Sequence, residues 1–118
     1  MSDDFSYPFN EDERLPGMLS YLAKECKGDT DRWFPNTNKL PFMALAMAGE
    51  VGEVANWIKK VERGSHTLEE VREALSEEVV DVFIYLLNIA GLLELDLEEG
   101  YYAKRIKNEE RFGGTHER

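Results

Sequence analysis

The sequence predicts an all-α protein folded as a four-helix bundle, and three features of the chain support this fold class. Four stretches repeat apolar residues at the intervals of three and four that are typical of amphipathic helices. Two of them open with N-terminal capping sequences, Thr67-x-x-Glu70 and Asp96-x-x-Glu99. Strand signals are missing, because the sequence has neither sustained alternation of apolar and polar residues nor an Asn-Gly or Asp-Gly turn. A chain of 118 residues is expected to form one domain whose modest core gains from oligomerisation.

The first helix is expected over residues 13–27, where a glycine follows and ends it. Residues 1–12 are acidic and aromatic, and we expect an arm that either packs on the domain or a partner subunit, or frays. Residues 28–40 are expected to form a loop rich in polar and aromatic side chains. This loop either covers a ligand or is fixed to the core by Trp33 and Phe34.

Three further helices are expected after this loop. Gly49 and Gly52 in the first of these three cost about 1 kcal/mol each relative to alanine, but they create a thin surface that a partner helix can approach closely. The helix after it is the most apolar, and we expect it to be the most buried. The expected ranges are 41–63, 67–93 and 96–112 for the three helices, 13–112 for the whole domain and 113–118 for a C-terminal tail.

Two pairs of carboxylates lie inside apolar helical stretches, Glu50 with Glu53 and Glu78 with Asp81. A spacing of three residues places both members of a pair on one face of a helix. At about 100° per residue, Glu50 and Glu78 fall within the apolar stripes of their helices. Glu53 and Asp81 fall at the edges of these stripes. Both helices therefore direct acidic side chains toward the core.

Acidic side chains in such positions need a partner, because a buried carboxylate that is not paired loses its hydration. Four carboxylates that face one another cannot all stay ionised unless a cation lies between them. Mg²⁺ or Mn²⁺ is the simplest solution, since both prefer oxygen ligands. The alternative is that both pairs lie on solvated faces of acidic surface helices, where this spacing is common. The matching helical phase of two pairs in neighbouring helices favours the metal site.

The composition of the chain excludes several classes of function. A formal net charge of −10 argues against non-specific binding to DNA or RNA. No apolar run approaches the ~20 residues that cross a bilayer, and the acidic N-terminus lacks a signal region, so we expect a soluble cytoplasmic protein. The single cysteine, Cys26, excludes an internal disulfide and is expected to be a buried or half-exposed thiol.

Basic residues gather near the C-terminal ends of the second and fourth helices. Lys60 belongs to the first group, where it either complements the helix dipole or meets phosphates. On the fourth helix, Lys104, Asn108 and Arg111 follow one another at intervals of four and three and so share one stripe. This stripe is either a solvated helix end or a means of bringing positive charge to a polyanion held by the metal.

The residues around the two acidic pairs resemble a known enzyme family. Glu50-x-x-Glu53 followed by Glu78-x-x-Asp81 is similar to the E-x-x-E…E-x-x-D signature of the all-α nucleoside triphosphate pyrophosphohydrolases. Within that superfamily the chain looks most like MazG-like proteins and dCTP pyrophosphatases, over roughly residues 33–112. The resemblance implies a four-helix MazG-like bundle completed by oligomerisation, as a homodimer or a homotetramer.

The same resemblance implies an activity and a role for each site residue. The expected enzyme uses Mg²⁺, with Mn²⁺ as a possible substitute, and cleaves the α–β bond of a nucleoside triphosphate to release pyrophosphate. The dCTP pyrophosphatases have a tryptophan where this chain has Lys60, which leaves the base preference open. Glu50, Glu53, Glu78 and Asp81 would hold the metal. The residues expected to line the pocket or contact the substrate are Lys60, Tyr85, Lys104, Asn108, Arg111 and Trp33.

Hydrolysis also needs a base for the attacking water. A carboxylate at the edge of the metal shell can take a proton from a metal-bound water. We expect Glu53 to be this base, with Glu50 as the alternative. The competing interpretation of the whole chain is a helical module without catalytic activity, which binds nucleotide or metal as a regulator or serves in assembly.

Overall fold

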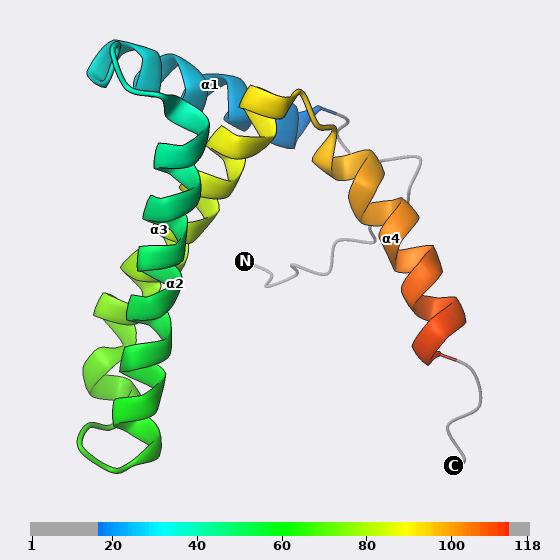
Figure 1. Ribbon diagram of the computed structural model, residues 1–118. Helices are drawn as coiled ribbons and strands as arrows, with labels where there is room; N and C mark the ends of the chain where they lie inside the picture. Colours follow the sequence, from blue (N-terminus) through cyan, green and yellow to red (C-terminus); the bar gives the residue numbers. More distant parts are fainter. Residues whose placement is uncertain (1–16, 114–118) are drawn as a thin grey trace, which may run out of the picture.

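The computed structural model describes residues 17–113, which form four helices and no strand (Figure 1). The helices are α1 (Met18–Trp33), α2 (Lys39–Glu62), α3 (Leu68–Leu93) and α4 (Leu97–Phe112). The predicted all-α class with four helices is confirmed. The predicted N-terminal arm, the first turn of the predicted first helix and residues 114–118 of the predicted tail lie outside the described residues. No helix of the described chain is long and apolar enough to span a membrane.

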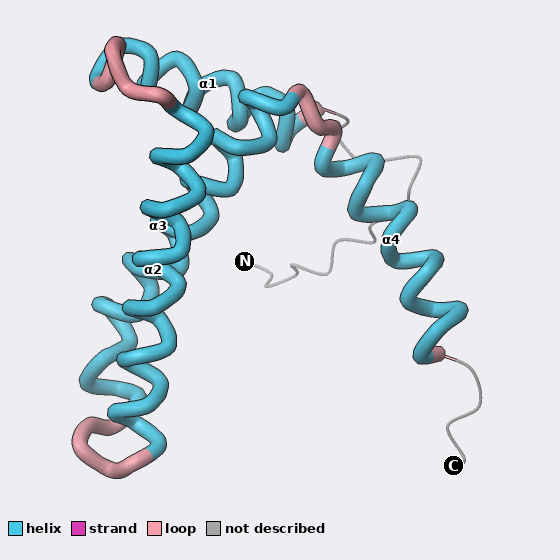
Figure 2. Tube along the Cα trace, viewed as in Figure 1, coloured by secondary structure: helices cyan, strands magenta, loops and turns pink. Residues whose placement is uncertain are grey.

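The helices α2 and α3 pack side by side as an antiparallel pair, joined at one end by the turn between Arg63 and Thr67 (Figure 2). At the other end of this pair, α1 lies across α3. The last helix, α4, packs on α1 and then diverges from the α2–α3 pair (Figure 1). A hydrogen bond helps to hold this arrangement, because the amide of Gly17 donates to Glu98 Oε1 at 2.8 Å.

The core of the described chain is small and lies where α3 meets α1 and α2. Its buried apolar residues are Ala23, Met43, Val71, Leu87 and Ala90. As predicted, α3 supplies more buried residues than any other helix of the described chain. The same helix nevertheless leaves large apolar side chains in solvent, with Val79 50% and Val80 51% exposed. One chain therefore buries only part of its apolar surface.

The helix boundaries agree with the sequence where a cap defines them. Thr67 caps α3 in a complete capping box, in which its hydroxyl accepts from the amide of Glu70 at 3.2 Å and Glu70 Oε1 accepts from the amide of Thr67 at 2.8 Å. Asp96 caps α4 in a similar way, accepting from the amide of Glu99 at 3.0 Å. Local hydrogen bonds of this kind depend on neighbouring residues only, which makes them predictable.

The predicted end of the first helix at Gly28 is wrong, because α1 continues through this glycine to Trp33. Ion pairs between successive turns support the continuation, from Lys27 to Asp31 at 3.1 Å and from Arg32 to Asp29 at 2.6 Å. A buried hydrogen bond from Thr30 to α3 adds to this support. Tertiary contacts therefore outweigh the low helix propensity of one glycine.

The close helix approach that we expected at Gly49 and Gly52 occurs elsewhere in the described chain. A Cβ added at either position would meet no atom within 4 Å. The close contact lies at Gly91 of α3, where an added Cβ would lie 3.3 Å from the backbone oxygen of Ala23 on α1. Gly91 thus allows α1 to cross α3 closely.

Candidate active site

Three of the four predicted acids converge in the seam between α2 and α3. Glu50 comes from α2, and Glu78 and Asp81 come from α3. Each offers one carboxylate oxygen, and these three oxygens lie within 4.8 Å of one another. All three residues are partly buried, as expected for acids on the faces with which the two helices pack. We call this group the acidic cluster.

The acidic cluster is electrostatically crowded. The pKa of Glu50 is raised above 4.5, chiefly by a hydrogen bond with Glu78, then by partial burial and by the negative charges of Glu78, Asp81 and Glu53. The pKa of the Tyr85 phenol is also raised, first by burial and then by the charges of Glu50 and Asp81. Tyr85 therefore lies near the charges of the acidic cluster, and its expected role in lining a substrate pocket stays a prediction.

The acidic cluster has the donor set of a site for a hard divalent cation. Carboxylate oxygens are the ligands that Mg²⁺ and Mn²⁺ prefer, and three of them meet within a space of a few ångströms. A bound cation would offset the negative charges that crowd Glu50 and raise its pKa. The residues present therefore fit the metal that the sequence predicts.

Glu53 lies outside the acidic cluster, although the sequence grouped it with Glu50. Its side chain is exposed at the edge of α2, and its Oε1 accepts a long hydrogen bond from Asn56 at 3.5 Å. The helical phase of Glu53 predicts this position, since the residue was expected at the edge of the apolar stripe. The described chain thus brings three candidate metal ligands together and leaves Glu53 one turn away.

The basic residues of the fourth helix are separated from the acidic cluster within one chain. Lys104, Asn108 and Arg111 are exposed on α4, which diverges from the α2–α3 pair (Figure 1). The guanidinium of Arg111 lies 4.7 Å from the ring centre of its neighbour Phe112. If these residues act on a substrate at the acidic cluster, another copy of the chain must supply them.

The contacts of Lys60 and Trp33 differ from those that we considered for them from the sequence. Lys60 Nζ lies 4.5 Å from the ring centre of Trp57, and His66 meets the same ring edge-on with ring centres 6.0 Å apart. The spacing of three residues between Trp57 and Lys60 is a sequence signal for this contact, which we did not predict.

Trp33 ends α1 and is 63% exposed, so it does not fix the following loop to the core. Phe34 does contact α2, through Phe42 at a ring distance of 5.5 Å.

Comparisons with known proteins show which family and which proteins this sequence resembles. Residues 40–112 match the family model of the MazG nucleotide pyrophosphohydrolase domain. The chain is 36% identical over 74 residues to dCTP pyrophosphatase 1 of Rattus norvegicus and to that of Mus musculus. Each alignment covers 59% of this chain and 44% of the relative, so the chain spans less than half the length of these relatives. No solved structure matches the chain significantly.

Proposed function

Because the chain belongs to the MazG nucleotide pyrophosphohydrolase domain family, we propose that it hydrolyses nucleoside triphosphates to monophosphates and pyrophosphate with Mg²⁺. Its similarity to proteins named dCTP pyrophosphatase 1 supports deoxynucleoside triphosphates, dCTP among them, as the first substrates to test. The observation that carries the proposal is the convergence of Glu50, Glu78 and Asp81 in one partly buried seam.

In this proposal the acidic cluster holds Mg²⁺ through Glu50, Glu78 and Asp81. When bound, the metal neutralises phosphate charge and makes a water molecule more acidic. Glu53 lies one helical turn from Glu50 and is exposed, so it is free to accept the proton of a water that attacks from solvent. Tyr85 would line the pocket beside the metal ligands.

A second copy of the chain would complete the site. Lys104, Asn108 and Arg111 point to phosphate and sugar contacts by their chemistry, but their own α4 lies away from the α2–α3 pair. The apolar residues that α3 leaves exposed support self-association as a homodimer or homotetramer. They include Val79, Val80, Phe83, Ile84 and Leu86. Residues 79, 83 and 86 follow helical spacing and so form one stripe that another helix can cover.

The test is the release of pyrophosphate from a panel of nucleoside triphosphates with Mg²⁺. Glu53→Gln and Glu50→Gln should both lower the rate, whereas the matched control Glu62→Gln, which changes an exposed residue of the same helix, should not. Equal rates for the wild type and Glu50→Gln would overturn the proposed function.

One observation favours a second candidate function, a nucleotide-binding or metal-binding module without turnover. Glu53, the proposed base, lies outside the acidic cluster and is exposed to solvent. A module of this kind would be stabilised by Mg²⁺ with a nucleotide, which a shift of the melting temperature would reveal. It would release no pyrophosphate under the same conditions.

A further inference from the structure

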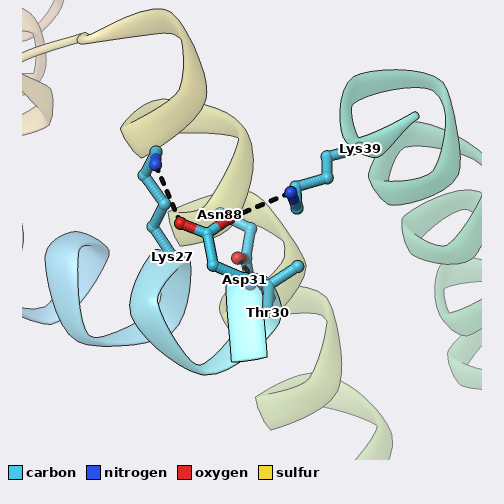
Figure 3. A network of polar contacts seen from close by, with 5 residues as sticks. All are labelled: Lys27, Thr30, Asp31, Lys39 and Asn88. Atoms are coloured by element: carbon cyan, nitrogen blue, oxygen red, sulfur yellow. Dashed lines mark hydrogen bonds and ion pairs between the residues drawn. The ribbon is translucent and has the colours of Figure 1, made fainter. Parts of the chain in front are cut away.

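Two consecutive residues of α1 connect this helix to both members of the α2–α3 pair (Figure 3). Thr30 Oγ1 donates a hydrogen bond to Asn88 Oδ1 of α3 at 2.8 Å, and both residues are buried. The next residue, Asp31, accepts from Lys39 Nζ of α2 at 3.0 Å. Lys27 of the preceding turn holds the other oxygen of Asp31 at 3.1 Å. We call these contacts the α1 bridge.

The α1 bridge lies at the open end of the α2–α3 pair, opposite the turn that joins the two helices. Lys39 is the first residue of α2, and Asn88 lies near the C-terminal end of α3. At 1.5 Å per residue, Asn88 is about 10 Å along α3 from Asp81, and Lys39 is about 16 Å along α2 from Glu50. The acidic cluster therefore lies between two points at which the spacing of α2 and α3 is held.

The acidic cluster needs such restraint at both ends. Three carboxylates within 4.8 Å of one another repel across the seam before a cation binds, which tends to separate α2 from α3. Little of the apolar surface along the seam is fully buried, since Met43 and Val71 are the largest fully buried side chains of the described chain. A metal site that opens without its ion must be reassembled on binding, which lowers its affinity.

The α1 bridge fixes the relative position of the helices more than it adds to the free energy of unfolding. A hydrogen bond between two buried polar side chains adds little net stability, and apolar residues of the same shape do nearly as well. The bond from Thr30 is directional, however, and Asn88 is fixed in turn by its Nδ2, which donates to the backbone oxygen of Ile84 at 3.0 Å. This chain of bonds helps to fix how α1 sits on α3.

We propose that Thr30 and Asp31 are positioning residues that hold α2 and α3 at the separation the acidic cluster needs to bind its divalent cation. This inference rests on the proposed function, since it assumes a metal at Glu50, Glu78 and Asp81. It goes further by assigning a role in metal affinity to residues of α1, which carries none of the metal ligands.

The test measures the dissociation constant of Mn²⁺, by electron paramagnetic resonance of the free ion, on the full chain without nucleotide. The variant Thr30→Val/Asn88→Leu replaces both buried polar partners by apolar groups, so its melting temperature should stay near that of the wild type. We expect its dissociation constant for Mn²⁺ to rise about threefold to tenfold. This loss of affinity is smaller than the largest losses seen when a group that hydrogen-bonds directly to a metal ligand is changed. Thr30→Ser keeps the hydroxyl and should bind Mn²⁺ like the wild type.

A second pair of variants avoids the core altogether. Asp31→Asn weakens the contacts to Lys39 and Lys27 and should also weaken Mn²⁺ binding. Asp29→Asn is the matched control, because Asp29 pairs with Arg32 within α1 only and should leave Mn²⁺ binding unchanged.

The results distinguish this inference from the proposed function. Wild-type affinity in both Thr30→Val/Asn88→Leu and Asp31→Asn would overturn the positioning role alone, provided that Glu50→Gln abolishes binding. Equal binding by the wild type and Glu50→Gln would instead overturn the metal site, and with it both proposals.

Discussion

Glu50 of α2 and Glu78 of α3 share a hydrogen bond across the seam between their helices, and this bond is the main reason why the pKa of Glu50 is raised. Two carboxylates bond in this way only when one of them carries a proton. Protonation of Glu50 therefore relieves the repulsion across the metal-free seam, at the position where the proposed function places a cation.

The metal-free protein should lose stability as the pH rises through the raised pKa of Glu50. A folded-state pKa above 4.5 means that the folded chain holds this proton more tightly than the unfolded chain does. The contribution is complete below pH 4.5 and is lost between that pH and the raised pKa. Urea unfolding at several pH values, compared between the wild type and Glu50→Gln, measures it, since the variant cannot titrate. Parallel pH profiles for the two proteins would contradict this prediction.

Mg²⁺ should raise the melting temperature of the wild type by several degrees, because an ion that binds only the folded chain stabilises it. Glu78→Gln removes a proposed metal ligand and should reduce this shift. Glu77→Gln changes the exposed neighbour on the same helix and should keep it. Differential scanning fluorimetry checks the three proteins. An equal shift in Glu78→Gln and Glu77→Gln would place the metal elsewhere.

Mixing two inactive variants should restore activity if α4 acts in a second copy of the chain. Glu50→Gln lacks a proposed metal ligand, and Lys104→Ala lacks a basic residue of α4. A mixed dimer contains one site with both residues intact, so unfolding and refolding the two variants together should return part of the wild-type rate of pyrophosphate release. No recovery, although the two variants assemble together, would show that each chain supplies its own Lys104.

Thr67→Ala should lower the free energy of unfolding by about 1 kcal/mol, which is typical for the loss of an N-cap. The change removes the hydroxyl that accepts from the amide of Glu70 at 3.2 Å. Thermal unfolding measures the effect, with Ser76→Ala as a control at an exposed position inside α3. Identical stability in the two variants would mean that the capping box contributes nothing.

Local features of the structure were predictable from the sequence, and long-range features were less so. The starts of α3 and α4 follow from Thr67 and Asp96, because capping involves residues three apart. The helical phase likewise predicted that Glu50 and Glu78 would meet at a packed face. These predictions needed no knowledge of how the helices are arranged.

The features that were not predicted depend on contacts between distant residues. The extension of α1 past Gly28 is supported by Thr30, whose partner Asn88 lies on α3. The spacing of residues along α1 does not indicate this contact with α3. The separation of α4 from the acidic cluster also depends on how whole helices are arranged. Local sequence patterns do not predict this arrangement.

The rate of pyrophosphate release from dCTP and other deoxynucleoside triphosphates, with Mg²⁺ and with product identification, tests the central claim most directly. We expect the wild type to yield monophosphate and pyrophosphate in equal amounts, and Glu50→Gln to be slower by at least about a hundredfold. Glu62→Gln should retain the wild-type rate. Release of inorganic phosphate instead, or equal rates for the wild type and Glu50→Gln, would contradict the assignment of the acidic cluster as the catalytic metal site.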